Sequence, residues 1–123
     1  MHEFSTVMGI VENVLQLASE KGAIKVHRID LDVGELTFLG LEQMKFSFDA
    51  VKEGTILQDA ELRLNIVKAK IECPECGYIG SPPDVEEDHF TIPIIQCPKC
   101  NALRVDIIEG KDCIIKGVEM EVN

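Results

Sequence analysis

Two Cys-Pro-x-Cys pairs, CPEC at 73–76 and CPKC at 97–100, decide how the second half of this 123-residue chain folds. Each pair places two thiolates on one tight turn, so that both can bind the same ion. Two such turns that face each other supply four sulfurs in a tetrahedron, which is the geometry of a structural zinc site. The next residues, Gly77 and Asn101, tolerate the left-handed backbone that such turns need. We therefore predict zinc ligands at Cys73, Cys76, Cys97 and Cys100.

A zinc ion with four thiolate ligands has no open coordination position for a water or a substrate. The metal is then expected to stabilise a module that is too small to bury a core of its own, and not to perform catalysis. An iron site of the rubredoxin type, and with it an electron carrier, is the alternative. Rubredoxins gather aromatic side chains around their iron, whereas this module offers only Tyr78 and Phe90 and the chain has no Trp. The sequence therefore favours zinc.

Charge and composition narrow the class of protein further. The chain carries 22 acidic and 12 basic residues, a formal charge of −10, so phosphate backbones repel it. A zinc-ribbon adaptor for nucleic acid or the transcription machinery would need a basic stripe with interleaved aromatic residues, which is lacking. No apolar run approaches the roughly 20 residues of a membrane span. Paired cysteines without a leader peptide indicate metal binding in a reducing compartment, and we expect a cytoplasmic protein.

Hydrophobic periodicity predicts two helices. Between residues 4 and 18, apolar residues recur at steps of three and four, and Gly22 is a plausible helix end. Helical spacing returns from Leu41 to Val51, and Gly54 follows it. Each pattern predicts one apolar face, as expected for a helix that covers a sheet.

Alternating patterns predict three strands of a sheet, at 27–33, 61–66 and 113–122. His27 shares the apolar parity of the first strand, so we expect a partly buried histidine with its hydrogen bonds satisfied. The parity reverses at 67–71, which predicts a bulge or a change of environment. A short strand is also expected within 89–96. The fifth cysteine, Cys113, is expected to be a small apolar residue of the last strand.

The order of these elements predicts an α+β fold. Two helices lie on one face of a three-stranded mixed sheet, and a zinc-ribbon module is inserted before the last strand. We expect residues 1–71 plus 111–123 to form one domain and residues 72–110 to form the zinc-binding domain.

His2 has the chemistry of an N-terminal metal site. Its imidazole can anchor a metal, and the backbone nitrogens of His2 and Glu3 can then lose their protons and join it in fused, planar chelate rings. Ni(II) and Cu(II) prefer square-planar nitrogen ligands, whereas Zn(II) and Mg(II) do not. The Met1 amine or the Glu3 carboxylate could complete the site. His89 in the metal module is a supplementary candidate, although a solvated loop histidine is the simpler interpretation.

Taken together, these features resemble the HypA/HybF family of nickel metallochaperones, over nearly the whole chain. The resemblance rests on the order of four features: Met1-His2-Glu3 opening a helix, Gly34-Glu35 closing the first strand, Gly54-Thr55 before a strand, and the two C-P-x-C turns. The 20-residue gap between the turns is longer than in many bacterial members. Its 89–93 stretch resembles an insertion of archaeal-type members.

The resemblance implies a function and a set of partners. It implies a nickel-binding domain, with nickel held by His2 and the first backbone nitrogens, and a domain with structural zinc. It also implies a protein without enzymatic turnover that delivers Ni(II) to the large subunit of [NiFe]-hydrogenase together with a GTPase of the HypB type. No membrane or nucleic-acid partner is expected, and we expect a monomer or a weak homodimer.

Overall fold

The computed structural model describes residues 2–83 and 95–123, which form two compact units. The first unit contains the described residues of 1–33, 39–65 and 113–123, and the second contains 34–38 and the described residues of 66–112. These divisions differ from the boundaries at 71 and 111 that the sequence suggests. The difference arises because residues 70–72 pair with strands of the second unit, and because a short segment at 34–38 also packs there.

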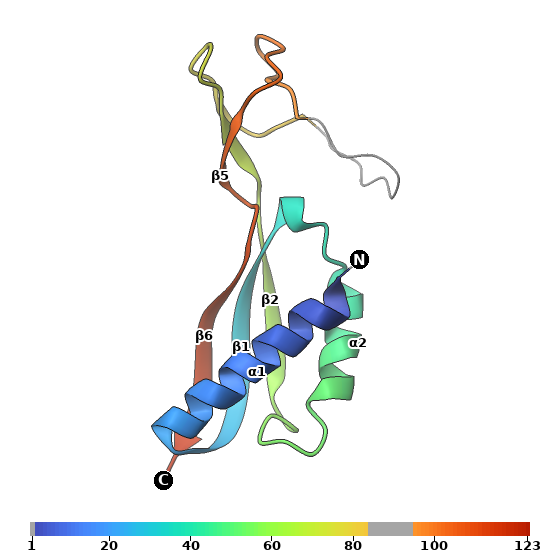
Figure 1. The fold of residues 1–123 in the computed structure, drawn as a ribbon, viewed down its shortest axis with the longest axis vertical. Coiled ribbons are helices and arrows are strands. Elements are labelled where there is room, and N and C mark those ends of the chain that lie inside the picture. Colours follow the sequence, from blue (N-terminus) through green and yellow to red (C-terminus); the bar gives the residue numbers. More distant parts are fainter. Residues whose placement is uncertain (1, 84–94) are drawn as a thin grey trace. The chain divides into compact units, whose positions relative to one another are not determined.

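The first unit is built on a three-stranded sheet with the order β2-β1-β6. Figure 1 shows two helices on one face of this sheet, with β1 and β2 running in the same direction, while β6 pairs with β1 in the antiparallel sense. The sheet is therefore mixed, and the predicted α+β arrangement is confirmed. The elements are α1 (Glu3–Lys21), β1 (Ala23–Gly34), α2 (Leu41–Val51), β2 (Glu61–Val67) and β6 (Cys113–Val122).

The predicted ends of the helices are close to those observed. α1 ends at Lys21, and the left-handed backbone of Gly22 after it (φ 69°) lets the Gly22 N–H bond to carbonyls of the last turn, at Ala18 and Ser19. α2 ends at Val51, and the turn after it uses Gly54 at φ 75°. In both places glycine supplies a conformation that a side chain would strain.

Apolar faces of the two helices and of β1 form the core of the first unit. Phe48 and Met44 from α2 pack with Ile29 and Leu31 from β1, and none is more than 2% exposed. Burial of one such side chain is worth about 1.5–3 kcal/mol relative to exposure. This core holds the first turn of α1 and the start of α2 on one scaffold.

The expected position of His27 on the apolar face of β1 is wrong. The β1–β6 register shifts between Val26 and Arg28, and Val26 takes the buried position with 0% exposure. The His27 side chain is half-exposed, and its Nε2 lies 3.1 Å from Oε1 of Glu121 on β6. The alternating pattern of the sequence does not reveal this irregularity, because Val26 and His27 are neighbours and either side chain could face the core. His27 is nevertheless a partly buried histidine with a hydrogen-bond partner, as expected.

The parity reversal after β2 marks a change of environment. β2 ends at Val67, and the fully buried Ile71 belongs to β3 (Lys70–Glu72) in the second unit. There, β3 lies between β4 (Ile79–Gly80) and β5 (Asp106–Glu109) in an antiparallel sheet. The strand predicted within 89–96 falls largely outside the described residues, and 95–96 are not in a strand.

Hydrogen bonds join three segments of the second unit near Gly34: residues 34–36, residues 110–112 and Ala69. The Gly34 N–H donates to the Asp112 carbonyl at 2.9 Å, and the Leu36 N–H donates to the Gly110 carbonyl at 2.8 Å. The Ala69 N–H donates to the Glu35 carboxylate at 3.0 Å. A side chain at position 34 would collide with the Gly110 backbone, so this close approach requires glycine.

We expect Gly34→Ala to lower the stability of the second unit by about 1–3 kcal/mol, the usual cost of overpacking, because the three colliding atoms all belong to the backbone. Urea unfolding of the zinc-loaded protein measures the change. Gly9→Ala is the matched control, since its new methyl group meets no atom within 4 Å and lies in a helix. An unchanged midpoint for Gly34→Ala would contradict the close approach.

Candidate metal centres

The two Cys-Pro-x-Cys turns have the same backbone design. In each, the residue after the second cysteine has a positive φ, 80° at Gly77 and 63° at Asn101, and donates its N–H to the carbonyl of the first cysteine at 2.9 Å. The N–H of the first cysteine then donates to the carbonyl of the residue that follows this positive-φ residue. The Cys73 N–H donates to the Tyr78 carbonyl at 2.8 Å, and the Cys97 N–H donates to the Ala102 carbonyl at 3.0 Å. The turns therefore present their sulfurs in equivalent ways, as the spacing predicts.

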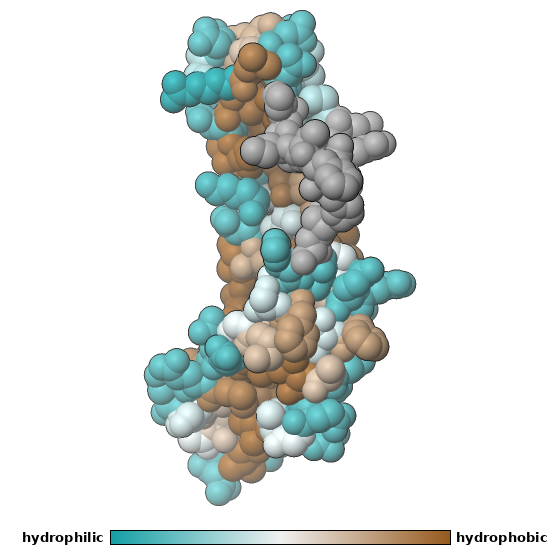
Figure 2. Space-filling model, turned by 45° about the vertical axis from the view of Figure 1, so that its right-hand side comes forward, coloured by the Kyte–Doolittle hydropathy of each residue, from teal (hydrophilic) through white to brown (hydrophobic). Residues whose placement is uncertain are grey.

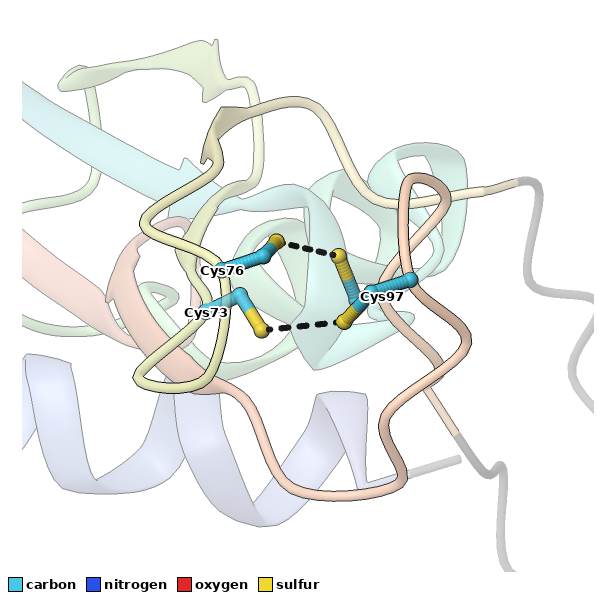
Figure 3. A group of neighbouring side chains, drawn as sticks. Cys73, Cys76 and Cys97 are labelled. Carbon is cyan, nitrogen blue, oxygen red and sulfur yellow. Dashed lines mark hydrogen bonds between the residues drawn. The ribbon is translucent and has the colours of Figure 1, made fainter.

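The four sulfurs converge on one point. Figure 3 shows the two turns facing each other with their thiols directed into the space between them. All four Sγ atoms lie within 4.8 Å of one another, and the pairs Cys73–Cys100 and Cys76–Cys97 are 3.6 Å apart. A tetrahedral zinc ion with Zn–S bonds of about 2.3 Å needs sulfur separations of about 3.8 Å. The arrangement fits zinc without rearrangement of the chain.

Ionisation of all four thiols in this cluster requires a cation. Burial acts to raise the pKa of Cys97, but the amides of Cys100 and Lys99 outweigh it and bring the value to about 7. At Cys100, the Ala102 amide acts to lower the pKa, whereas burial and the three neighbouring sulfurs raise it to about 12. The Cys97 thiolate thus forms readily, whereas burial and the neighbouring sulfurs disfavour a second thiolate at Cys100. A divalent ion removes this repulsion, and its binding free energy then stabilises the fold.

The remaining cysteine lies apart from this cluster. Cys113 is the first residue of β6 and packs against the core of the first unit, where burial raises its pKa. Among the residues that the structure describes, the four cysteines are the one group of three or more potential ligands that converges on a metal-sized space. The closed thiolate set is therefore a structural site.

The predicted N-terminal site lies at the start of α1. His2 is exposed and occupies the position before the first helical residue. Its carbonyl accepts the Thr6 N–H at 2.9 Å and the Ser5 hydroxyl at 3.1 Å, while its imidazole makes no capping hydrogen bond. The imidazole can thus face a ligand, and the backbone beside it is held in place.

Glu3 connects the starts of the two helices. Its Oε2 accepts the N–H of Gly40, the residue before α2, at 2.8 Å. This hydrogen bond is the first cause of a lowered pKa, from the ordinary 4.5 to about 2. The contact spans 37 residues of sequence, and no local sequence pattern predicts it. The one available signal is that Gly40 offers no side chain to cap α2.

A hollow of about 760 Å³ opens beside His2 between α1 and α2. Two of its aromatic side chains are largely exposed, Phe4 at 57% and Phe46 at 78%. Figure 2 shows hydrophobic residues among hydrophilic ones at the surface of the first unit, in the lower half of the view. The other lining residues are Glu3, Ser5, Glu42, Gln43 and Ser47. The proposed ligands are therefore accessible to a second molecule.

The described residues include six of the eight predicted metal ligands. Met1 and His89 lie outside the described residues. His2 and Glu3 are adjacent at the start of α1, and the four cysteines form a separate cluster in the second unit. In the described parts of the chain, no helix is both long enough and apolar enough to cross a membrane.

These features define a class of protein: a small α+β protein with a zinc-ribbon module and an exposed histidine at the start of its first helix. The family model described as "Hydrogenase/urease nickel incorporation, metallochaperone, hypA" matches residues 1–120. The chain therefore belongs to the HypA family of nickel metallochaperones, which act in hydrogenase maturation.

Individual relatives agree with this assignment. The chain is 39% identical over 121 residues to the hydrogenase maturation factor HypA of Methanothermobacter thermautotrophicus, covering 98% of both chains. It is 37% identical over 126 residues to that of Methanocaldococcus jannaschii, again with 98% coverage of both. The solution structure of the Ni metallochaperone HypA from Helicobacter pylori has the same fold, with a TM-score of 0.70 over the full length of both chains at 24% identity.

We expect Cys97→Ser to remove the one equivalent of zinc, because a hydroxyl is a poor replacement for a buried thiolate. The amide resonances of the second unit should then lose their dispersion, while those of the first unit persist. Zinc analysis and a ¹⁵N–¹H spectrum measure both effects. Cys113→Ser is the matched control and should keep its zinc. Full zinc content in Cys97→Ser would contradict the four-thiolate site.

The lowered pKa of Glu3 predicts a pH-dependent contribution to stability. The unfolded chain takes up a proton at Glu3 near 4.5, whereas the folded chain does so only near 2. The contribution is therefore complete above pH 4.5 and is lost as the pH falls towards 2. We expect wild type to be more stable than Glu3→Gln at neutral pH, with the difference vanishing across this interval. A difference that stays constant with pH would show that the carboxylate charge is not involved.

Proposed function

We propose that the chain carries Ni(II) on the His2 imidazole together with the backbone nitrogens of His2 and Glu3. The observation that supports this most strongly is the position of His2, exposed and directly before the first helical residue. The first N–H groups of a helix have no intrahelical acceptor. Nickel can therefore replace the proton on the Glu3 amide without breaking the hydrogen-bond ladder of α1.

The first turn of α1 also suits a deprotonated amide. The Glu3 nitrogen and the His2 carbonyl belong to one planar peptide group, so loss of the proton increases negative charge on the carbonyl oxygen. That oxygen already accepts two hydrogen bonds, from Thr6 and Ser5. These donors favour the nickel-bound form. The Met1 amine and His89 are further proposed ligands.

We further propose that the cargo is delivered to the large subunit of [NiFe]-hydrogenase, with a GTPase of the HypB type as partner and without catalytic turnover. An exposed site that depends on one imidazole can release its metal, whereas a buried site with several histidines would retain it. The hollow beside His2 gives the recipient access. The need for reduced thiolates supports a cytoplasmic location.

We expect His2→Ala to abolish stoichiometric nickel binding while zinc content and folding stay as in wild type. Competition titration of the untagged protein, with zinc counted in parallel, measures this. His27→Ala is the matched control, because His27 lies on β1 beside Glu121 and should not affect nickel. Residues added before Met1 should also weaken binding. Nickel binding that survives both His2→Ala and the added residues would refute the site.

Nickel affinity should also fall as the pH is lowered, because protons compete with the metal for the imidazole and for the amides. Equilibrium titrations at a series of pH values measure the slope. An affinity that does not change with pH would exclude ligands that must lose protons.

A further inference from the structure

The Glu3 carboxylate acts as the cap of a helix to which it does not belong. α2 begins after Gly40, which has no side chain to satisfy the free N–H groups of the helix start. Glu3, the first residue of α1, supplies a carboxylate that accepts the Gly40 N–H at 2.8 Å. A negative charge is also favourable at the positive end of the α2 dipole. Two helix starts are thus joined by one side chain.

This contact holds the peptide that would bind nickel. The His2 carbonyl is fixed by the Thr6 N–H at 2.9 Å and the Ser5 hydroxyl at 3.1 Å. The Glu3 nitrogen lies in the same peptide plane, and the Glu3 side chain is fixed on Gly40. The peptide between His2 and Glu3 is therefore held on both sides. A chelate that is already in its binding geometry loses less conformational freedom when the metal arrives.

We propose that the Glu3 carboxylate is a positioning group for the nickel site and is not itself a nickel ligand. The inference rests on the proposed nickel site at His2. If the carboxylate turned to the metal, the Gly40 N–H would lose its acceptor and α2 would lose its cap. The carboxylate instead hydrogen-bonds to Gly40, which fixes Glu3 and so orients the peptide that carries the ligand nitrogens. Hydrogen bonds around metal ligands commonly have this role.

Removal of the Gly40 donor tests this directly. Gly40 has φ −77° and ψ 121°, a backbone that proline adopts, so Gly40→Pro removes the N–H and keeps the φ of this residue. We expect its nickel affinity to fall roughly tenfold to a hundredfold. Gly40→Ala is the matched comparison, because it keeps the N–H and its methyl group meets only the end of the flexible Gln43 side chain.

Substitutions of Glu3 test the same contact from the other side. Glu3→Ala should weaken nickel binding as much as Gly40→Pro does, and the two changes together should cost no more than either alone. Glu3→Gln keeps an oxygen acceptor for the Gly40 N–H and should restore most of the affinity. The visible absorption spectrum of the nickel-saturated protein should be the same in wild type, Glu3→Gln and Gly40→Pro, because the ligand atoms do not change.

Several outcomes would overturn the positioning role. One is equal nickel affinity in Gly40→Pro and Gly40→Ala. Another is a Glu3→Gln variant that binds as weakly as Glu3→Ala and has an altered nickel spectrum, since the carboxylate would then be a ligand. If Gly40→Pro does not fold, as judged by zinc content and thermal melting, the two Glu3 variants decide. His2→Ala separates the hypotheses: if it keeps nickel the proposed site fails, whereas if it loses nickel the Gly40 and Glu3 variants test positioning alone.

Discussion

Mutual repulsion of four thiolates is the constraint on which the second unit depends. Its described residues bury few large apolar side chains beyond Ile71, and the buried Cys73 and Cys97 occupy the place of a core. Sulfurs at 3.6 Å cannot all ionise without a cation between them. A zinc ion supplies that cation and fills its own coordination positions with sulfur. Because all four coordination positions are occupied by sulfur, the zinc ion that stabilises the fold has no open position for a substrate.

The transport of nickel therefore requires a different kind of site, and we propose that it lies at the start of α1. Its proposed ligands are an imidazole and backbone nitrogens, which suit a square-planar ion and not zinc. These groups are exposed, so a recipient can approach them, yet the peptide that carries them is fixed by hydrogen bonds to His2 and Glu3. Exposure allows release, and fixation supplies affinity without additional ligands. In this proposal the two metals are separated by ligand chemistry as well as by position in the chain.

Much of this could be predicted from the sequence where the signal is local. The C-P-x-C spacing located all four sulfurs, and the periodicity of 4–18 and 41–51 located both helices. The misplacement of His27 came from a shift in the β1–β6 register, which depends on a strand about ninety residues away. Likewise, no local pattern shows that Gly34 fits against Gly110 or that Glu3 caps α2. Contacts between distant segments depend on the path of the folded backbone, which local patterns in a single sequence do not predict.

We propose that the zinc site stabilises the protein and that the N-terminus carries the cargo. X-ray absorption at both metal edges of one doubly loaded sample tests it most directly. The zinc edge should show four sulfur neighbours at about 2.3 Å. The nickel edge should show only nitrogen and oxygen neighbours, including one imidazole, and this signal should disappear in His2→Ala. Sulfur in the nickel coordination shell, or a zinc edge with fewer than four sulfurs after nickel is added, would contradict the account.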